Sequence, residues 1–274
     1  MLKKYRKLEK KRKSQGIPAL ALTAEQVADL VGLIKKPPTG EEGALIDLLK
    51  NRIPAGVDQA AYVKAAFLTD IAKGNLKTPL IDNKSATQLL GTMLGGYNIE
   101  PLIQLLQNEE VGEVAVKALS NTLLIFDAFH DMFELSKIND NAKKVIHSWA
   151  EAQWFLNRPV VPECITAKVL KVNGEINTDD LSPGPEAWSR PDIPLHALSM
   201  LKNTDFKDPI GTINKLEESG HPVAFVGDVV GTGSSRKSAT NSLLWHIGDD
   251  IPYIPNKRTG GICLGGKIAP IFFN

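Results

Sequence analysis

The strongest local signal for chemistry is a glycine turn between an apolar run and a polar one. The string FVGDVVGTGSSRKSAT runs from Phe225 to Thr240 and predicts a strand, a turn and then a helix over SSRKSATNSLLWHIG. Free backbone N–H groups and the dipole at the start of such a helix favour an anion. Ser234, Ser235 and Arg236 stand where that anion would bind. Arginine can hold a carboxylate through two hydrogen bonds, and a serine hydroxyl can bind it or act as a base if a positive field lowers its pKa.

Two familiar nucleotide-binding loops do not match this segment. A Walker A loop needs a glycine immediately before Lys237-Ser238, where Arg236 stands, and a dinucleotide-binding fingerprint needs a third glycine at the same position. Nucleotide binding is therefore disfavoured. For this loop taken alone, a structural alternative stays open: a glycine turn capped by serine, with the arginine in solvent.

A second polar cluster lies upstream, in NTDDLSP (residues 177–183) and WSRPDIP (residues 188–194). It adds a second arginine, Arg190, and the acids Asp179 and Asp180. Two arginines and a serine pair suit a small polycarboxylate, with an aspartate to orient an arginine or a distant histidine. For Asp179 by itself, a turn or helix-cap role remains the more common one.

Both clusters lie in the part of the chain whose pattern is typical of β/α structure. Residues 165–172 alternate and are rich in branched side chains, as are residues 222–226. We place the boundary of this second domain, residues 158–274, in the proline-containing stretch at about 158–163. Residues 265–274 predict a strand that enters further structure, so the chain is expected to stop in mid-domain.

The first domain, residues 1–157, shows helical spacing without strand alternation. Thr23 and Gln26 predict a capping box, and the helix that they begin is expected to end before Pro37-Pro38. Further helices are predicted at about 41–51, 58–73, 84–94, 99–108, 111–127 and 141–156. Consecutive helices with short turns indicate an α-solenoid or bundle.

Charge and hydropathy narrow the classes of partner. The net charge is +1, and residues 3–13 hold eight Lys or Arg against the single acid Glu9. A solvated first helix is the favoured interpretation of this run, with attraction to RNA phosphates or to a mitochondrial import receptor as the alternatives. No stretch reaches the roughly 20 apolar residues of a membrane span, and no apolar segment follows the basic start, so we expect a cytoplasmic protein.

Two sets of apolar or sulfur-bearing residues are expected to be structural. Cys164 and Cys263 lack any partner at metal-site or disulfide spacing, so both are predicted to be buried free thiols. Trp149, Trp154 and Phe155 are predicted to lie in the core, given the area that such rings bury.

Longer strings resemble a known family. TDDLSP, WSRPDIPLHAL, GDVVGTGSSRKSATNS and GDDIPYIPNKRTGGICLGGKIAPIFFN resemble the swivelling domain of the aconitate hydratase B family, and LLGTMLGGYNI and WAEAQWFLNRP resemble its HEAT-like leading domain. The resemblance covers nearly all 274 residues and is specific, because long uninterrupted strings agree in order; the first 15 residues are the least diagnostic. It implies a multidomain α then α/β fold: an α-helical HEAT-like solenoid in residues 1–157, followed by an incomplete β/α swivelling domain of the aconitase type in residues 158–274.

The resemblance implies a hydro-lyase of the tricarboxylic acid cycle that interconverts citrate and isocitrate through cis-aconitate, and dehydrates 2-methylisocitrate in some members. Six positions match the family's site motifs: Thr178, Asp179, Arg190, Ser234, Ser235 and Arg236. By these motifs Ser234 would be the alkoxide base that removes the carbon-bound proton. Ser235 and Arg236 would hold one substrate carboxylate and Arg190 another, with Asp179 as a supporting acid of the family's Thr-Asp pair.

The family's cofactor is a [4Fe–4S] cluster held by three cysteines, with one iron left open as a Lewis acid. The resemblance places those cysteines in domains that follow the swivelling one, and neither Cys164 nor Cys263 stands at a ligand position. We therefore expect this chain to ligate no metal and to lack hydratase activity by itself.

Two rival hypotheses come from other classes. The first is an interaction module, since helical solenoids offer extended surfaces and the family's leading domain is associated with homodimer formation and with binding of mRNA when iron is scarce. The second is a free-standing small subunit of a related hydro-lyase, such as an isopropylmalate isomerase, that pairs with a cluster-bearing partner. A reading frame that continues past Asn274 into a cysteine-bearing region would favour the enzyme over this small subunit.

Overall fold

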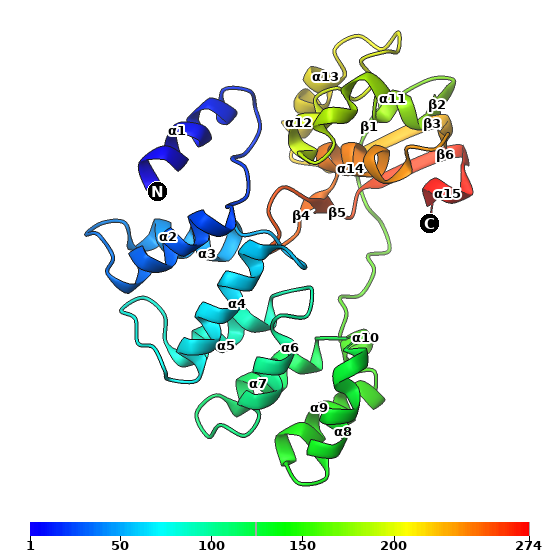
Figure 1. Ribbon diagram of the computed structural model, residues 1–274. Helices are drawn as coiled ribbons and strands as arrows, with labels where there is room; N and C mark the ends of the chain where they lie inside the picture. The colour runs from blue at the N-terminus through cyan, green and yellow to red at the C-terminus, as the bar shows by residue number, and fades with distance from the viewer. Residues whose placement is uncertain (124, 274) are drawn as a thin grey trace. The chain divides into compact units, whose positions relative to one another are not determined.

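A computed structural model describes residues 1–123 and 125–273, which fall into two compact units (Figure 1). The helical unit comprises residues 21–161 together with 1–2 and 253–255. The α/β unit comprises residues 162–252, residues 3–20 and the segment from 256 to the C-terminal end. Residues 3–13 of the first helix therefore belong to the α/β unit, although they precede the helical unit in sequence.

The helical unit is a series of short helices joined by short turns (Figure 1). They are α2 (Ala24–Lys35), α3 (Glu42–Asn51), α4 (Gln59–Ala72), α5 (Asn83–Gly91), α6 (Ile99–Leu105), α7 (Gly112–Ser120), the 3-10 turn η1 (Phe126–Ala128), α8 (Phe129–Ser136), α9 (Asp140–Ala150) and α10 (Gln153–Leu156). The predicted capping box starts α2: Thr23 Oγ1 accepts from the backbone N–H of Gln26 at 3.3 Å, and Thr23 N donates to the Gln26 side chain at 3.0 Å. The prediction that this helix ends before the two prolines is also confirmed, since its last residue is Lys35.

The core of this unit runs through neighbouring helices, with α4 against α2 and α5, and α7 against α5 and α9. Several helices contribute a fully buried leucine, such as Leu68 on α4, Leu90 on α5 and Leu119 on α7. Helices α5 and α7 approach closely at Gly91, where an added Cβ would lie 2.6 Å from the Cβ of Ala118. This packing of sequential helices confirms the predicted helical array.

Two predicted helices are shorter than expected. The helix predicted over 111–127 ends at Ser120, because the side chains of Asn121 and Thr122 donate to backbone carbonyls four residues back and so terminate the last turn. The helix predicted over 141–156 is interrupted at Ala152, whose φ of 51° lies in the left-handed region and separates α9 from α10.

Two expectations of burial are wrong in part. Cys164 is exposed, while Cys263 is half-buried and burial raises the pKa of its thiol. Phe155 is exposed, and Trp149 and Trp154 are only half-buried, although the Trp149 indole donates a 2.9 Å hydrogen bond from Nε1 to the carbonyl of Leu119. Aromatic type predicts burial only where a neighbouring helix covers the ring, and α10 is a single short turn at the end of the series.

The α/β unit is built on a parallel sheet of β1 (Lys168–Lys171), β2 (Glu175–Asn177), β3 (Val223–Thr232) and β6 (Ile262–Ile268). The long strand β3 pairs with β1 through its first half, with β2 through its second half and with β6 on its other edge. The other elements are α11 (Thr178–Leu181), the 3-10 helix η2 (Gly184–Ser189), α12 (Ile193–Ala197), α13 (Pro209–Glu217), α14 (Arg236–Ile247), α15 (Pro270–Phe273) and the pair β4 (Asp249–Asp250) and β5 (Arg258–Thr259). The strand predicted over 265–274 ends at Ile268, because Pro270 cannot donate to a sheet and suits the first turn of a helix.

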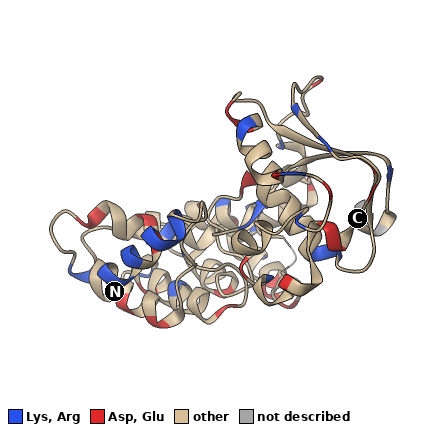
Figure 2. Ribbon diagram, turned by 90° about the horizontal axis from the view of Figure 1, so that it is seen from above, with Lys and Arg blue, Asp and Glu red and all other residues tan. Residues whose placement is uncertain are grey.

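The first helix, α1 (Leu2–Lys13), carries the basic run (Figure 2). Seven of its eight Lys and Arg are exposed, as expected for a solvated helix, but Arg12 is only 6% exposed. Arg12 Nη1 and Nη2 donate to Asp192 at 2.6 and 2.8 Å, and Nε donates to the carbonyl of Pro18 at 2.5 Å. This two-pronged ion pair attaches α1 to the start of α12. Among residues 1–123 and 125–273, no helix has the length and apolar character needed to cross a membrane.

Candidate functional site

The predicted site residues gather where β2 and β3 end. These strands are parallel and paired up to Asn177 and Thr232, so their carboxyl ends lie at the same edge of the sheet. Helix α11 begins directly after β2, and the turn of residues 233–235 leads from β3 into α14. In open α/β sheets this edge is where ligands bind.

Gly233 permits the close approach of the two segments. Its φ is +106°, and an added Cβ would lie 2.5 Å from the Thr178 Oγ1 atom. The buried Thr178 hydroxyl accepts a 3.1 Å hydrogen bond from the backbone N–H of Ser235. A side chain at Gly233 would displace Thr178, and with it the backbone that starts α14.

The start of α14 is not capped by its own N-cap residue. Ser235 holds this position, but its side chain makes no cap hydrogen bond. Ser235 Oγ instead accepts from Arg190 Nη2 at 3.2 Å and donates to Asp179 Oδ1 at 3.3 Å. The structural alternative for this loop, a serine-capped turn, is therefore not what forms. The first backbone N–H groups of α14 keep the geometry that suits an anion.

Asp179 is freed for this contact by its neighbour Asn177. Asn177 is the N-cap of α11, and its Oδ1 accepts from the N–H groups of Asp179 and Asp180 at 2.7 and 2.9 Å. Asp180 completes a capping box by accepting from Asn177 N at 2.8 Å. The cap role that is common for aspartate thus belongs to Asn177 and Asp180, and the Asp179 carboxylate faces Ser235.

Arg190 follows η2 and is half-buried. Besides Ser235 Oγ, its Nη2 donates to the carbonyl of Ser182 at 3.2 Å. Ser234 is exposed in the turn, and Arg236 is the half-buried first residue of α14. The structure thus joins Thr178, Asp179 and Arg190 to Ser235 by hydrogen bonds, and places Ser234 and Arg236 on either side of Ser235 in the chain.

Comparison with known proteins matches both units. A model of the aconitate B N-terminal domain matches residues 4–155, more than half of the chain, and a model of the aconitate hydratase 2 N-terminus matches residues 167–274. The chain belongs to the aconitate hydratase B family. Its resemblance to that family, inferred from the sequence strings, is therefore confirmed.

Curated relatives agree along the whole chain. It is similar to the protein named aconitate hydratase B of Escherichia coli strain K12, with 60% identity over 284 residues that cover 100% of this chain and 33% of the relative. The proteins of the same name from Synechocystis and Helicobacter pylori are 59% and 52% identical, covering 100% and 99% of this chain and 32% of each relative. The chain spans about a third of the length of these relatives.

Sequence reasoning missed the polar side chains that support the site of this family member. His196 on α12 is 2% exposed and bonds through its two ring nitrogens to the hydroxyls of Ser182 and Ser189, at 2.7 and 2.8 Å. Burial, and after it the charge of Arg190, lowers the pKa of His196. A sequence signal existed: Asp192 followed by Ile-Pro predicts a helix start, which places His196 one turn into a helix just after Arg190.

The described residues do not fit the [4Fe–4S] cluster that the family resemblance implies. Among residues 1–123 and 125–273, no group of three or more His, Cys, Asp or Glu side chains is placed to hold a metal. Cys164 is exposed in the segment before β1, and Cys263 lies within β6. A cluster of this kind needs three cysteine ligands, and the chain has two cysteines.

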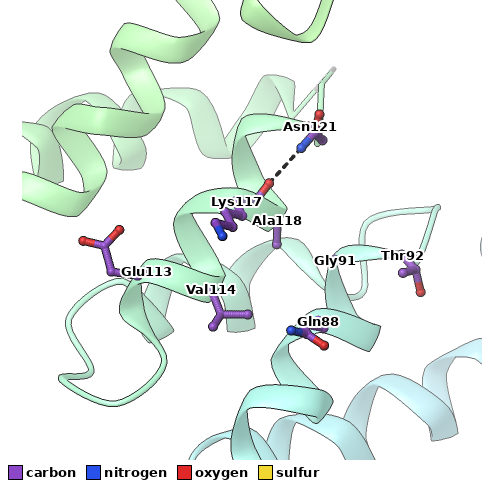
Figure 3. A pocket seen from close by; sticks show the side chains of 8 residues that line it. All are labelled: Gln88, Gly91, Thr92, Glu113, Val114, Lys117, Ala118 and Asn121. Atoms are coloured by element: carbon purple, nitrogen blue, oxygen red, sulfur yellow. Dashed lines mark hydrogen bonds between the residues drawn. The ribbon is translucent and has the colours of Figure 1, made fainter. Parts of the chain in front are cut away.

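The helical unit has a pocket of its own between α5 and α7 (Figure 3). Its lining consists of Gln88, Gly91, Thr92, Glu113, Val114, Lys117, Ala118 and Asn121. In the close-up, the Asn121 side chain bends back to the carbonyl of Lys117, which is the contact that ends α7. None of the predicted site residues lines this pocket.

Proposed function

We propose that this chain supplies the carboxylate-binding side of an aconitate hydratase, the hydro-lyase that interconverts citrate and isocitrate through cis-aconitate. Dehydration of 2-methylisocitrate is part of the same proposal. The observation that carries it is Ser235, whose hydroxyl is held between Arg190 and Asp179 at the uncapped start of α14. An arginine beside free helix N–H groups suits a small polycarboxylate. The name of the family, aconitate hydratase, contains the name of such a ligand.

Each site residue has a role in this proposal. Arg190 and Arg236 bind substrate carboxylates, and Ser235 and the first N–H groups of α14 complete the anion site. Ser234 is the base: positive charge from a neighbouring guanidinium group and the helix N-terminus would stabilise its alkoxide, which takes the carbon-bound proton. Thr178 and Asp179 support Ser235 from α11.

The proposed role of this chain ends at binding and proton transfer. A [4Fe–4S] cluster would supply the Lewis acid for the departing hydroxyl, and its ligands would lie outside these 274 residues. We therefore expect no hydratase activity from the chain by itself. Cytoplasmic location, a homodimer through the helical unit and an mRNA partner belong to the proposal on family resemblance alone. Identity of 60% to a protein named aconitate hydratase B favours the enzyme over a small subunit of another hydro-lyase.

The test is a calorimetric titration of the purified chain with tricarballylate, a citrate analogue without the hydroxyl. We expect weak binding that is lost in Arg190→Ala and in Arg236→Ala. Lys215→Ala, which removes an exposed positive charge on α13, is the matched control and should bind as the wild type does. Equal binding by all four proteins, or no binding by a folded wild type, would contradict the proposal for this chain.

A further inference from the structure

His196 lies at the centre of a buried hydrogen-bond network behind the carboxylate site. Its Nε2 is 2.7 Å from Ser182 Oγ, and Ser182 Oγ is 2.8 Å from Ser238 Oγ. Ser238 Oγ donates to the carbonyl of Ser235 at 3.0 Å. On the other side of the ring, Nδ1 is 2.8 Å from Ser189 Oγ. The network therefore reaches from α12 to both sides of the anion site.

The hydroxyls of Ser182 and Ser238 form a chain of hydrogen bonds with a single direction. Ser182 donates to Ser238 and Ser238 to the carbonyl of Ser235, and the Nε2 atom of His196 bonds to Ser182 at the head of this chain. Hydrogen bonds that follow one another in this way strengthen each other in a low-dielectric interior. On the other side of the ring, the hydroxyl of Ser189 donates to the carbonyl of Glu186 at 2.7 Å, and Nδ1 lies 3.1 Å from the same carbonyl.

The serines of this network adjoin or contact residues of the proposed carboxylate site. Ser189 immediately precedes Arg190, and the carbonyl of Ser182 accepts from Arg190 Nη2 at 3.2 Å. Ser238 lies one turn into α14, directly behind Ser235. The imidazole itself is buried and makes no contact with Arg190 or with the Ser235 hydroxyl among the hydrogen bonds of the described residues. Any influence of His196 on a ligand must therefore pass through these serines.

We propose that His196 is the positioning residue of the carboxylate site, holding Arg190 and the start of α14 at the separation at which both can bind one substrate. This inference rests on the proposed function. Its physical basis is that the segment from Ser182 to Ser189 is a loop with a short 3-10 helix, which has few backbone hydrogen bonds of its own to fix it. A rigid ring bonded at both ends supplies that constraint, and an alanine would leave buried hydroxyls to rearrange.

The test compares His196→Ala and His196→Gln with the wild-type chain. Glutamine can keep a donor for Ser182, while alanine cannot. The matched control is His246→Ala, since His246 is also a buried histidine of the α/β unit, but it bonds through Nε2 to the backbone carbonyl of Ala197 at 2.9 Å. Melting temperature, tricarballylate affinity and the Arg190 side-chain Nε–H signal in ¹H–¹⁵N NMR spectra are recorded for each. The Nε atom of Arg190 is buried, so a well-positioned guanidinium should give a sharp signal that exchanges slowly with water.

We expect His196→Ala to weaken tricarballylate binding about tenfold, the scale of one lost buried hydrogen-bond partner, and to broaden or shift the Arg190 signal. His196→Gln should recover most of the affinity. His246→Ala should lower the melting temperature at least as much but leave the Arg190 signal and the affinity unchanged.

An unchanged Arg190 signal and unchanged affinity in His196→Ala would overturn the positioning role, and so would equal losses in the His246→Ala control. If the wild type itself does not bind tricarballylate, the proposed function of the chain fails separately. The Arg190 signal then decides the role of His196 without any ligand: its loss in His196→Ala alone supports the role, and its persistence overturns it.

Discussion

The two units differ in what they bury. In the helical unit the core is mainly aliphatic. Among its described residues, the buried polar or charged side chains are Lys64, Thr87, Asn98 and Ser148. Among the described residues of the α/β unit, the buried polar side chains are Arg12, Thr178, Ser182, Ser189, His196, Ser199, Ser242 and His246. Several of these lie in or beside the segments that carry the proposed anion site.

Backbone hydrogen bonding explains this difference. A helix satisfies its own N–H and C=O groups, so a helical array needs mainly apolar side chains to pack. The segment from Asn177 to Ala197 is a chain of single turns and a 3-10 helix, whose backbone and side-chain polar groups must find partners in the interior. The stability of the helical unit thus depends mainly on how well apolar side chains fill its core. The stability of the α/β unit depends in addition on hydrogen bonds between buried polar groups.

The largest effect is expected from breaking the buried ion pair of the α/β unit. Arg12→Ala would leave the Asp192 carboxylate without its bidentate partner, at a cost of about 3–5 kcal/mol to the folding of that unit. Hydrogen exchange followed by mass spectrometry should show lost protection in α1, α12 and the sheet, with the helical unit unchanged. Lys10→Ala, an exposed charge on the same helix, is the control. Equal loss of protection in both units would contradict the claim that only the α/β unit depends on this buried ion pair.

A cavity in the core of the helical unit should destabilise that unit and leave the α/β unit unchanged. Leu68 is fully buried on α4, and Leu68→Ala should destabilise the helical unit by about 2–5 kcal/mol through lost burial and the cavity left behind. The same exchange measurement should show lost protection confined to α2 through α9. Val57→Ala, a change at a position that is 75% exposed, should have almost no effect. Lost protection in β3 would show that the two units do not unfold independently.

A smaller effect is expected at the turn of the proposed anion site. Gly233→Ala adds a Cβ against Thr178 at a residue with positive φ, at a cost of about 1–3 kcal/mol in the free energy of unfolding. Gly174→Ala is a close control, because Gly174 also has a positive φ, of +83°, but open space where its Cβ would lie. The excess cost of the first change over the second, measured by urea denaturation, reports the packing against Thr178. Equal costs would mean that Thr178 moves freely.

The smallest effect is a difference in pH dependence. Burial lowers the pKa of His196 and of His246 in the α/β unit from 6.5, so the unfolded state binds protons more readily than the folded one below that pH. This stability is present above pH 6.5 and falls as the pH drops toward the lowered values. In the helical unit burial lowers the pKa of Lys64 to about 8, so its stability falls between pH 10.5 and 8 and is constant below.

Lowering the pH from 8 to 5 should therefore destabilise the α/β unit more than the helical unit. Melting curves that resolve the two units, or exchange measured at each pH, would show it. Replacing both buried histidines by glutamine should flatten the pH dependence of the α/β unit. A parallel decline in the two units would contradict this assignment to the histidines.

Much of this protein was predictable from local sequence, because the relevant interactions span a few residues. The capping box of Thr23 and Gln26 joins neighbours three apart, and the strand, glycine turn and helix around Gly233 follow from one continuous string. Helix ends were less predictable where side chains of Asn121 and Thr122 competed with the backbone, since the same residues are also tolerated within helices.

The partners of the buried polar groups were decided by the tertiary structure. Arg12 meets Asp192 across 180 residues of chain, and Ser182 meets Ser238 across 56. In the sequence, Arg12 and the two serines lie in polar runs, and such runs are usually solvated. No spacing rule connects positions that are so far apart. The sequence by itself determined which elements form and which residues could bind an anion. Only folding decided which charges and hydroxyls would be buried, because a polar group can leave water only where another part of the chain arrives to bond it.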